Sequence, residues 1–160
     1  MPFNIDDSAA SLPVPDAAEA DHSLRLVKLI QSEMANGPMS FSRFMELALY
    51  APGLGYYSAG KTKFGESGDF VTAPELGNVF ARCIARQCAQ VLDELDGGDI
   101  LEAGAGSGAL AADLLTELER LQQLPANYYI LELSADLRER QQARIRQQIP
   151  HLLERVQWLD

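Results

Sequence analysis

The stretch "ILEAGAGSGAL", residues 100–110, constrains the fold more than any other part of the chain. A short apolar run leads into Gly104, Gly106 and Gly108, and a helical pattern begins at Ala109. Glycine adopts backbone angles, and permits close approach of a ligand, that a Cβ atom prevents. A strand that passes through such a turn into a helix is typical of the first unit of a nucleotide-binding α/β fold.

The segments after the turn repeat the alternation of strand and helix. We expect a helix at 109–123, a buried strand in "YYILEL" (128–133), a helix at 134–149 and a third strand in "RVQWLD". This order predicts a parallel sheet with crossover helices. Residues 75–160 are therefore interpreted as the first half of a doubly wound, Rossmann-like α/β domain.

Helices are also expected before this domain. Residues 1–22 contain five acidic residues and no lysine or arginine, which indicates a disordered acidic arm. Ser23 is the predicted N-cap of a helix that ends before Gly37, and Ser40 that of a second helix. Residues 23–74 are interpreted as these two helices followed by a loop.

The loop, residues 51–74, is rich in glycine, proline and aromatic residues and lacks a helical period. An irregular segment of this length within a domain is usually functional. Helical spacing returns at residues 75–95. The residues that share one face of this expected helix are Leu76, Val79, Phe80, Cys83, Ile84, Gln87, Val91 and Leu95.

Charge and composition exclude several functions. The net charge of −10 repels phosphate backbones, so we expect no nucleic-acid partner. No run approaches the roughly 20 apolar residues of a membrane span, and the N-terminus resembles neither a secretory nor a mitochondrial leader. The only cysteines, Cys83 and Cys88, lie outside redox or zinc spacing. We expect a cytoplasmic location, free thiols and no metal site.

Glu102, two positions before the first glycine, bears on the kind of ligand. In a dinucleotide dehydrogenase the pyrophosphate lies over this turn, where a facing carboxylate costs on the order of several kcal/mol. S-adenosylmethionine (SAM) has no phosphate and carries an ammonium and a sulfonium, so the acid favours it. The glycine spacing alone fits either ligand, or a turn that only lets the helix pack closely on the strand.

Glu132 strengthens this interpretation. It ends the second expected strand, 24 residues after Gly108. A carboxylate at the tip of that strand can accept hydrogen bonds from both hydroxyls of a ribose. Two acids at neighbouring strand tips, with glycines between them, match an adenosine joined to an amino-acid tail.

Four segments resemble the MidA-like family of SAM-dependent methyltransferases. They are "GYYS", "FGESGDFVTAPE", "LEAGAGSGALAADLL" and "LELSADLRERQ", and the resemblance runs from about Phe41 to Gln141. The family's mitochondrial members are linked to respiratory complex I assembly through arginine methylation. The resemblance implies a SAM-binding fold, SAM as the cofactor and a protein substrate with arginine as the methyl acceptor.

The resemblance also places a site on this chain. The implied cofactor-binding residues are Gly68, Asp69, Thr72, Glu102, Gly104, Gly106, Gly108 and Glu132. Asp69 is in addition the candidate catalytic residue, because a carboxylate is needed to hold a guanidinium and accept its proton. Glu75 is expected to open the next helix, where the helix dipole favours an acid, with a functional role as the alternative. Tyr56 and Tyr57 are expected to pack the loop on the core, with substrate contact as the alternative.

The expected sheet is incomplete. In doubly wound folds the ligand crevice lies between the first and fourth strands, and the third strand is the last one expected here. We therefore expect an N-terminal, cofactor-binding piece that is inactive alone, or a chain that self-associates through its uncovered sheet edge. A non-catalytic SAM-binding or assembly factor is the alternative, and a NAD-dependent oxidoreductase is a weaker one.

Overall fold

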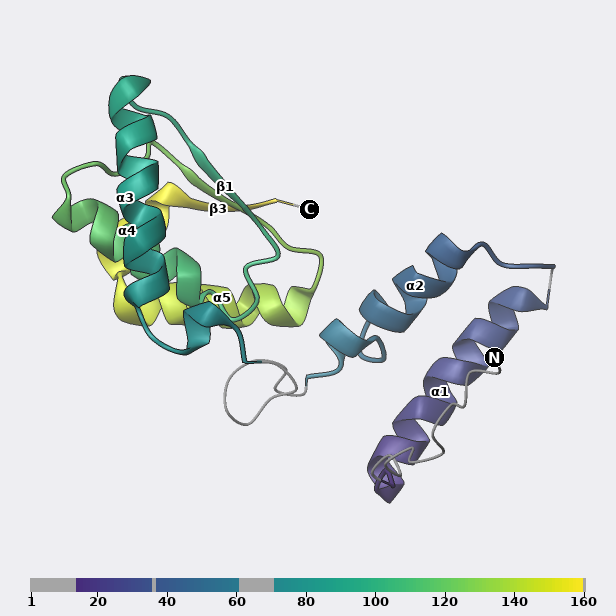
Figure 1. The fold of residues 1–160 in the computed structure, drawn as a ribbon. Helices are drawn as coiled ribbons and strands as arrows, with labels where there is room; N and C mark the ends of the chain where they lie inside the picture. The colour runs from purple at the N-terminus through teal and green to yellow at the C-terminus, as the bar shows by residue number, and fades with distance from the viewer. Residues whose placement is uncertain (1–13, 36, 61–70, 160) are drawn as a thin grey trace, which may run out of the picture.

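The computed structural model describes residues 14–35, 37–60 and 71–159 (Figure 1). It contains two parts, which we call the N-terminal hairpin (α1 and α2) and the α/β unit (η2 to β3). The elements are α1 Ala17–Met34, α2 Phe41–Tyr50, η1 Tyr56–Ser58, η2 Ala73–Glu75, α3 Val79–Glu94, β1 Ile100–Ala103, α4 Ala109–Arg120, β2 Tyr128–Leu131, α5 Ala135–Gln148, η3 Pro150–Arg155 and β3 Val156–Leu159, where η is a 3₁₀ helix. In Figure 1 the hairpin lies to one side of the α/β unit.

The sheet of the α/β unit has three parallel strands in the order β1-β2-β3. Their register places Glu102 opposite Ile130, and Ile130 opposite Trp158. The crossover helices α4 and α5 connect successive strands, as the sequence predicts. The expected fold, the first part of a Rossmann-like domain with a small open sheet, is confirmed.

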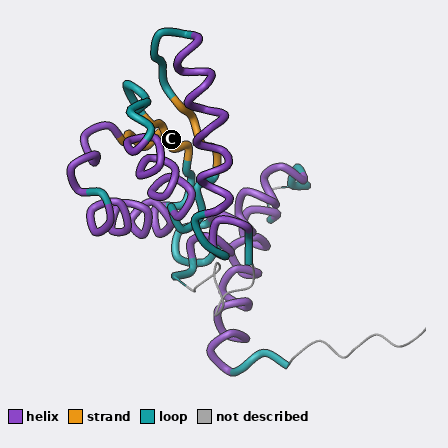
Figure 2. Tube along the Cα trace, turned by 60° about the vertical axis from the view of Figure 1, so that its left-hand side comes forward, coloured by secondary structure: helices purple, strands orange, loops and turns teal. Residues whose placement is uncertain are grey.

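The two faces of the sheet differ in how far helices cover them. Tyr128, Ile130 and Val156 are buried in one hydrophobic core with residues of α3, α4 and α5. Most of the alternate residues of the strands are exposed, for example Leu101 with 61% of its surface accessible. Figure 2 shows the strands in orange beside the purple helices of this unit. Because parallel sheets are normally covered on both faces, the exposed face is the incomplete side of this unit.

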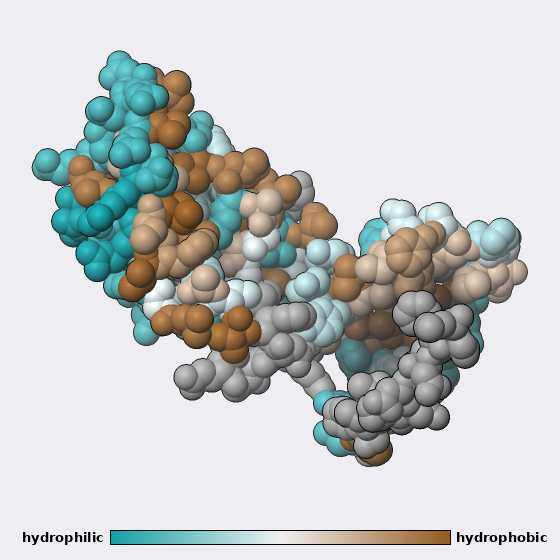
Figure 3. Space-filling model, viewed as in Figure 1, coloured by the Kyte–Doolittle hydropathy of each residue, from teal (hydrophilic) through white to brown (hydrophobic). Residues whose placement is uncertain are grey.

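Helix α3 does not bury the whole face that the sequence marks as apolar. Ala81, Ala85 and Leu92 are buried, whereas Val79 and Val91 are 69% and 54% exposed. Small side chains allow two helix axes to approach closely, and α3 lies against the alanine- and leucine-rich face of α4. Figure 3 shows the resulting brown, hydrophobic surface among the hydrophilic residues of this part.

Local capping explains where several helices begin. The Ser40 hydroxyl accepts a hydrogen bond from the backbone N–H of Arg43, at 3.2 Å, and α2 begins at Phe41 as predicted. Ser134 caps α5 in the same way through the N–H of Leu137. A side-chain oxygen at the N-cap satisfies an N–H group that the helix itself cannot.

The start of α1 differs from the prediction. The helix begins at Ala17, not at Ser23, so residues 17–22 are helical and not part of a disordered arm. The Asp16 carboxylate accepts from the N–H of Glu19, and the Glu19 carboxylate accepts from the N–H of Asp16. This reciprocal capping box stabilises the first turn of α1. The acidic composition of residues 1–22 indicates disorder, and for this reason the sequence does not predict a helix start at Ala17. Residues 1–13 of the expected arm lie outside the described residues.

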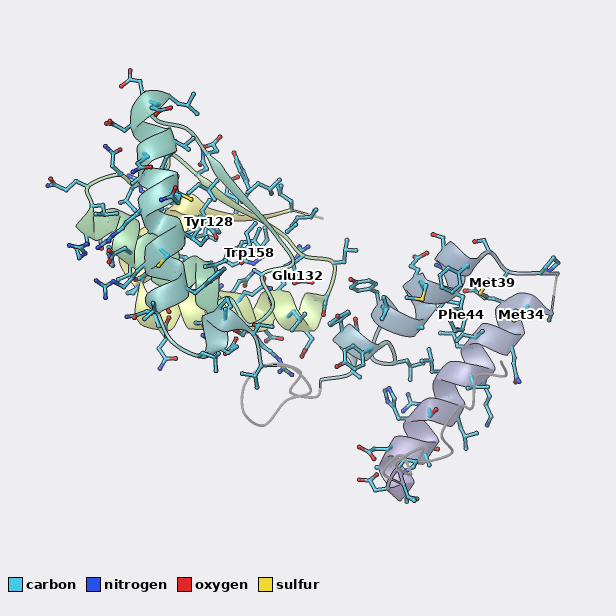
Figure 4. All side chains as sticks on the ribbon, viewed as in Figure 1. Met34, Met39, Phe44, Tyr128, Glu132 and Trp158 are labelled. Atoms are coloured by element: carbon cyan, nitrogen blue, oxygen red, sulfur yellow. The ribbon has the colours of Figure 1, made fainter. Side chains whose placement is uncertain are left out.

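The hairpin is held together mainly by exposed contacts. Arg43 of α2 donates two hydrogen bonds to the Glu33 carboxylate of α1, at 2.6 and 2.9 Å. The labelled side chains Met34 and Phe44 lie where the two helices adjoin (Figure 4). Helix α1 contains no buried residue. The hairpin therefore has little core of its own.

Candidate functional site

The turn after β1 has the backbone conformation that the glycines predict. Gly104, Gly106 and Gly108 have φ values of 69°, 54° and 78°, a left-handed region that other residues rarely adopt. A Cβ atom at Gly104 would meet no protein atom within 4 Å, whereas one at Gly108 would lie 3.2 Å from the Cα of Gln141. Gly104 thus leaves open space above the turn, and Gly108 permits close packing of α4 on α5.

A cavity of about 330 Å³ opens on the β1 side of this turn. Residues at the tip of β1, in the glycine turn and in the segment around η2 line it. The residues that matter most for its chemistry are Thr72, Glu75, Glu102, Gly104 and Gly106. The cavity therefore brings Thr72 of the loop to the same place as the first acid and the glycines, as the sequence predicts.

The Glu102 carboxylate is held by a buried tyrosine. Its Oε2 atom accepts a hydrogen bond from the hydroxyl of Tyr128, at 2.8 Å. Burial raises the pKa of Glu102 above its ordinary value, and the hydrogen bond from Tyr128 opposes this rise. Burial also raises the pKa of Tyr128, with the charge of Glu102 as the second cause. Tyr128 therefore remains protonated and donates to the acid.

A second cavity, of about 240 Å³, lies on the other side of the turn. It is lined by Tyr50, Tyr57, Gly104, Gly106, Glu132 and Leu137. Gly104 and Gly106 line both cavities, so the two cavities adjoin at the glycine turn. The sequence predicts two acids at neighbouring strand tips with glycines between them; in the structure Glu102 lines one cavity and Glu132 the other.

Glu132 is 5% exposed and accepts two hydrogen bonds. The backbone N–H of Ser134 donates to Oε1 at 2.9 Å, and the side-chain amide of Gln141 donates to Oε2 at 3.0 Å. A carboxylate oxygen accepts about two hydrogen bonds. Each oxygen of Glu132 therefore has room for one more donor, which is what a pair of neighbouring hydroxyls requires.

The charge of the lining decides which ligands fit. Among the described residues that line the two cavities, three are carboxylates, Glu75, Glu102 and Glu132, and none is lysine or arginine. A diphosphate would meet three acids with no compensating cation from these residues. A ligand with hydroxyls and a positive charge finds acceptors in both cavities, so the lining fits an adenosyl sulfonium amino acid.

Glu75 does not open a helix. Helix α3 begins at Val79 with Asn78 as its N-cap, and Glu75 ends the short helix η2. The Glu75 carboxylate accepts a short hydrogen bond from the hydroxyl of Ser107 in the glycine turn. The helix-opening role is wrong for this reason, and Glu75 instead connects the segment before α3 to the turn.

Sequence reasoning missed part of the second cavity. Tyr50, the last residue of α2, received no role, and Tyr57 was expected to pack the loop on the core. Their rings stack with centroids 5.6 Å apart, and both line the cavity beside Glu132. Burial raises the pKa of Tyr50, with the charges of Tyr57 and Glu132 as further causes. The cluster of tyrosines on both sides of Pro52–Gly53 was the available signal.

Two arginines of α5 also have defined partners. Arg138 donates to the backbone carbonyls of Glu132 and Leu159, at 2.8 and 3.1 Å. Arg140 donates to the carbonyl of Gly60 at 2.7 Å. These contacts join α5 to the strand tips and to the segment after η1.

The remaining predicted site residues, Gly68 and Asp69, lie outside the described residues. Their roles stay predictions. Six of the eight implied cofactor-binding residues are thus described. Five of them line the cavities and Gly108 lies beneath the turn, against α5.

Comparison with known proteins gives a consistent result. Residues 83–160 match the model of a family described as S-adenosyl-L-methionine-dependent methyltransferases. The protein arginine methyltransferase NDUFAF7 of Danio rerio, a mitochondrial protein, is 31% identical over 100 residues, which are 61% of this chain and 24% of that protein. Its Caenorhabditis elegans homologue is 28% identical over 141 residues, 82% of this chain and 32% of that protein.

Two solved structures of similar proteins give the same result as the sequence comparisons. A Burkholderia thailandensis protein crystallised with S-adenosyl-homocysteine superposes with a TM-score of 0.81 and is 47% identical, over 94% of this chain and 40% of that one. A native crystal structure from the same organism gives a TM-score of 0.76 at 45% identity. The chain therefore spans about a quarter to two fifths of the length of the relatives cited here.

The structure and the comparisons give only partial information on where in the cell the protein is located. No helix within the described residues is long and apolar enough to cross a membrane. The curated relatives carry "mitochondrial" in their names. The expected cytoplasmic location therefore has no support from them and stays a prediction from the sequence.

Proposed function

Since this chain belongs to the MidA-like family of SAM-dependent methyltransferases, we propose that the protein binds SAM across the glycine turn and transfers its methyl group to a protein side chain. The observation that carries the proposal is the lining of the two cavities: three carboxylates and open glycine backbone, with no lysine or arginine among the described lining residues. This lining rejects a diphosphate and accepts a cation.

In this proposal the two cavities divide the ligand between them. Glu132 accepts the two ribose hydroxyls, one on each oxygen, beside the stacked Tyr50 and Tyr57. The amino-acid tail lies in the other cavity, where Glu102 accepts from its ammonium and Tyr128 holds that carboxylate in place. Gly104 lets the ligand approach the backbone between them.

Bound SAM supplies a methyl group already activated by the sulfonium. The chain's own contribution is to orient the ligand and exclude water, which can lower a barrier by roughly 7–11 kcal/mol. Thr72 and Glu75 line the cavity on the side of the loop and are placed to limit solvent there. Asp69 and Gly68 are proposed to cover the ligand from the same loop, with Asp69 taking the proton of the acceptor.

Arginine of a protein is the proposed acceptor. The support is the name of the curated relatives, which are protein arginine methyltransferases. A guanidinium is also compatible with an acidic cavity, because carboxylates hold it through charge-assisted hydrogen bonds. The chain spans about a quarter of the zebrafish relative, so the activity is proposed for the full-length gene product.

Isothermal titration with SAM, S-adenosyl-homocysteine and NAD tests the proposal. We expect binding of the first two and no binding of NAD; NAD binding without SAM binding would overturn it. Glu132→Gln is expected to weaken S-adenosyl-homocysteine binding by about tenfold or more, because a charged acceptor is lost. Glu154→Gln, at an exposed position of η3, is the matched control and should leave the affinity unchanged.

Methyl transfer is tested separately on the full-length protein. Radiolabelled SAM and arginine- or lysine-containing peptides are expected to give label on arginine only. Binding of SAM without label on any protein substrate would support the non-catalytic alternative and remove the enzymatic part of the proposal.

A further inference from the structure

We propose that Gln141 is a positioning residue that aims the Glu132 carboxylate at the ribose hydroxyls of the ligand. This inference rests on the proposed function and adds to it a residue that does not line either cavity. Gln141 lies on α5 and is fully buried, with 0% of its surface exposed. A buried amide must find partners for its donors and its acceptor.

The Gln141 amide has three partners from three different elements. Its nitrogen donates to the backbone carbonyl of Gly106 and to Oε2 of Glu132, both at 3.0 Å. Its oxygen accepts from the indole N–H of Trp158 on β3, at 3.0 Å. Figure 4 labels Glu132 and Trp158, the two side chains that the amide bridges. One side chain thus joins the glycine turn, the tip of β2 and the edge strand.

These partners fix the direction of the amide. Trp158 can only donate, so it must face the amide oxygen. The Gly106 carbonyl and Oε2 of Glu132 are the acceptors, so both face the amide nitrogen. A rotation of the amide by 180° would break all three hydrogen bonds. Trp158 therefore acts through Gln141 on the orientation of Glu132.

The second hydrogen bond on Glu132 completes the positioning. The N–H of Ser134 holds Oε1 while Gln141 holds Oε2, so neither oxygen can turn away without losing a bond in a buried site. The hydroxyl of Ser134 in turn donates to the carbonyl of Tyr57, at 2.5 Å. This bond connects the network to the stacked Tyr50 and Tyr57 that line the cavity. The carboxylate is thus held in place before a ligand arrives.

A purely structural role for Gln141 makes a different prediction from a positioning role. The test compares S-adenosyl-homocysteine with an analogue that lacks the 2′ and 3′ hydroxyls, by isothermal titration. Gln141→Leu is expected to weaken the binding of S-adenosyl-homocysteine about tenfold more than that of the analogue, because only the natural ribose uses Glu132. Gln147→Leu, at an exposed position of the same helix, should change neither affinity.

Equal losses for both ligands in Gln141→Leu would overturn the inference and leave Gln141 as a packing residue. If circular dichroism shows that this variant does not fold, Trp158→Phe decides. It replaces the indole by a smaller ring that has no N–H to orient the amide. We expect a severalfold larger loss of affinity for S-adenosyl-homocysteine than for the analogue, and equal losses for the two ligands would overturn the inference. A wild-type protein that binds neither SAM nor S-adenosyl-homocysteine contradicts the proposed function instead.

Discussion

The α/β unit and the N-terminal hairpin both consist largely of amphipathic helices, but they differ in what covers those helices. Leu115 and Leu118 of α4 are completely buried against the sheet and the neighbouring helices. In α1, Leu24 and Val27 lie on a helix without a single buried residue. The hairpin depends on capping and on an exposed ion pair between Arg43 and Glu33.

This difference indicates that the α/β unit provides most of the stability and most of the residues of the site. Burial of apolar surface contributes about 25 cal/mol per Å², whereas an exposed ion pair contributes little. The site belongs to the well-buried unit, apart from Tyr50 and Tyr57, which the hairpin and η1 add to it. A change in the hairpin should therefore reach the site through Tyr50 and Tyr57 rather than through the glycine turn.

The largest expected effect comes from the core of the α/β unit. Leu118→Ala should lower the free energy of unfolding by about 2–5 kcal/mol, because it leaves a cavity that the rigid surroundings cannot fill. Leu24→Ala in α1 is the matched control, with an expected change within about 0.5 kcal/mol. Urea unfolding followed by circular dichroism measures both. Equal losses would show that the hairpin shares the core's cooperativity.

A smaller effect is expected for two glycines of the turn. Gly104→Ala should lower the free energy of unfolding by about 1–2 kcal/mol, the cost of a left-handed residue with a side chain. Gly108→Ala should cost more, because its Cβ would also meet Gln141 at 3.2 Å. For binding of S-adenosyl-homocysteine the order reverses, since only Gly104 faces open space. Titration of both variants checks this reversal.

The capping box gives a test confined to the hairpin. Asp16→Ala removes the N-cap of α1 and should destabilise that helix by about 1 kcal/mol. Hydrogen exchange should show faster exchange of the α1 amides, with protection of α4 and α5 unchanged. Asp21→Ala, within the same helix, is the control. Faster exchange throughout the chain would contradict the separation of the two parts.

The smallest expected effect concerns pH. The folded-state pKa of Glu102 lies above its ordinary value because of burial. The folded chain therefore binds this proton more tightly than the unfolded chain, and stability declines as the pH rises from the ordinary pKa through the raised one. Glu102→Gln should remove this contribution, so the stability difference between variant and wild type shifts in favour of the variant over that range. Affinity for SAM in the wild type should increase over the same range, as the acid ionises.

Tyr128→Phe sharpens the pH test. It removes the hydrogen bond that opposes the rise in the pKa of Glu102. The pH at which SAM affinity increases should therefore move upward in this variant. Tyr129→Phe, on the neighbouring position of β2, is the control. An unchanged profile in Tyr128→Phe would remove Tyr128 from the site.

We also expect this chain to self-associate, and the difference between the two faces of the sheet indicates through which surface. The exposed face carries Leu101, Leu131 and Leu159. Sedimentation velocity of this chain is expected to show concentration-dependent association, which Leu101→Lys should reduce. A monomer at all concentrations would leave the exposed face without a role in assembly.

The sequence alone determined the order of strands and helices, the glycine turn, and the acids Glu102 near the end of β1 and Glu132 directly after β2. These features depend on interactions within a few residues: the period of apolar side chains, the cap at Ser40, and backbone angles that only glycine adopts readily. Such signals are local, so they can be read without a neighbour. Glu132 could be predicted as a site residue from the sequence because the carboxyl ends of parallel strands lie at the same edge of a sheet.

Only the tertiary structure decided which surfaces meet. Helix α3 packs through Ala81, Ala85 and Leu92, whereas Val79 and Val91 stay exposed, because the small side chains let α3 approach the alanine- and leucine-rich face of α4 closely. Glu75 reaches Ser107, and Gln141 reaches Trp158, across elements that lie far apart in the chain. Partners of this kind depend on the register of strands and the separation of helices, which no short stretch of sequence encodes.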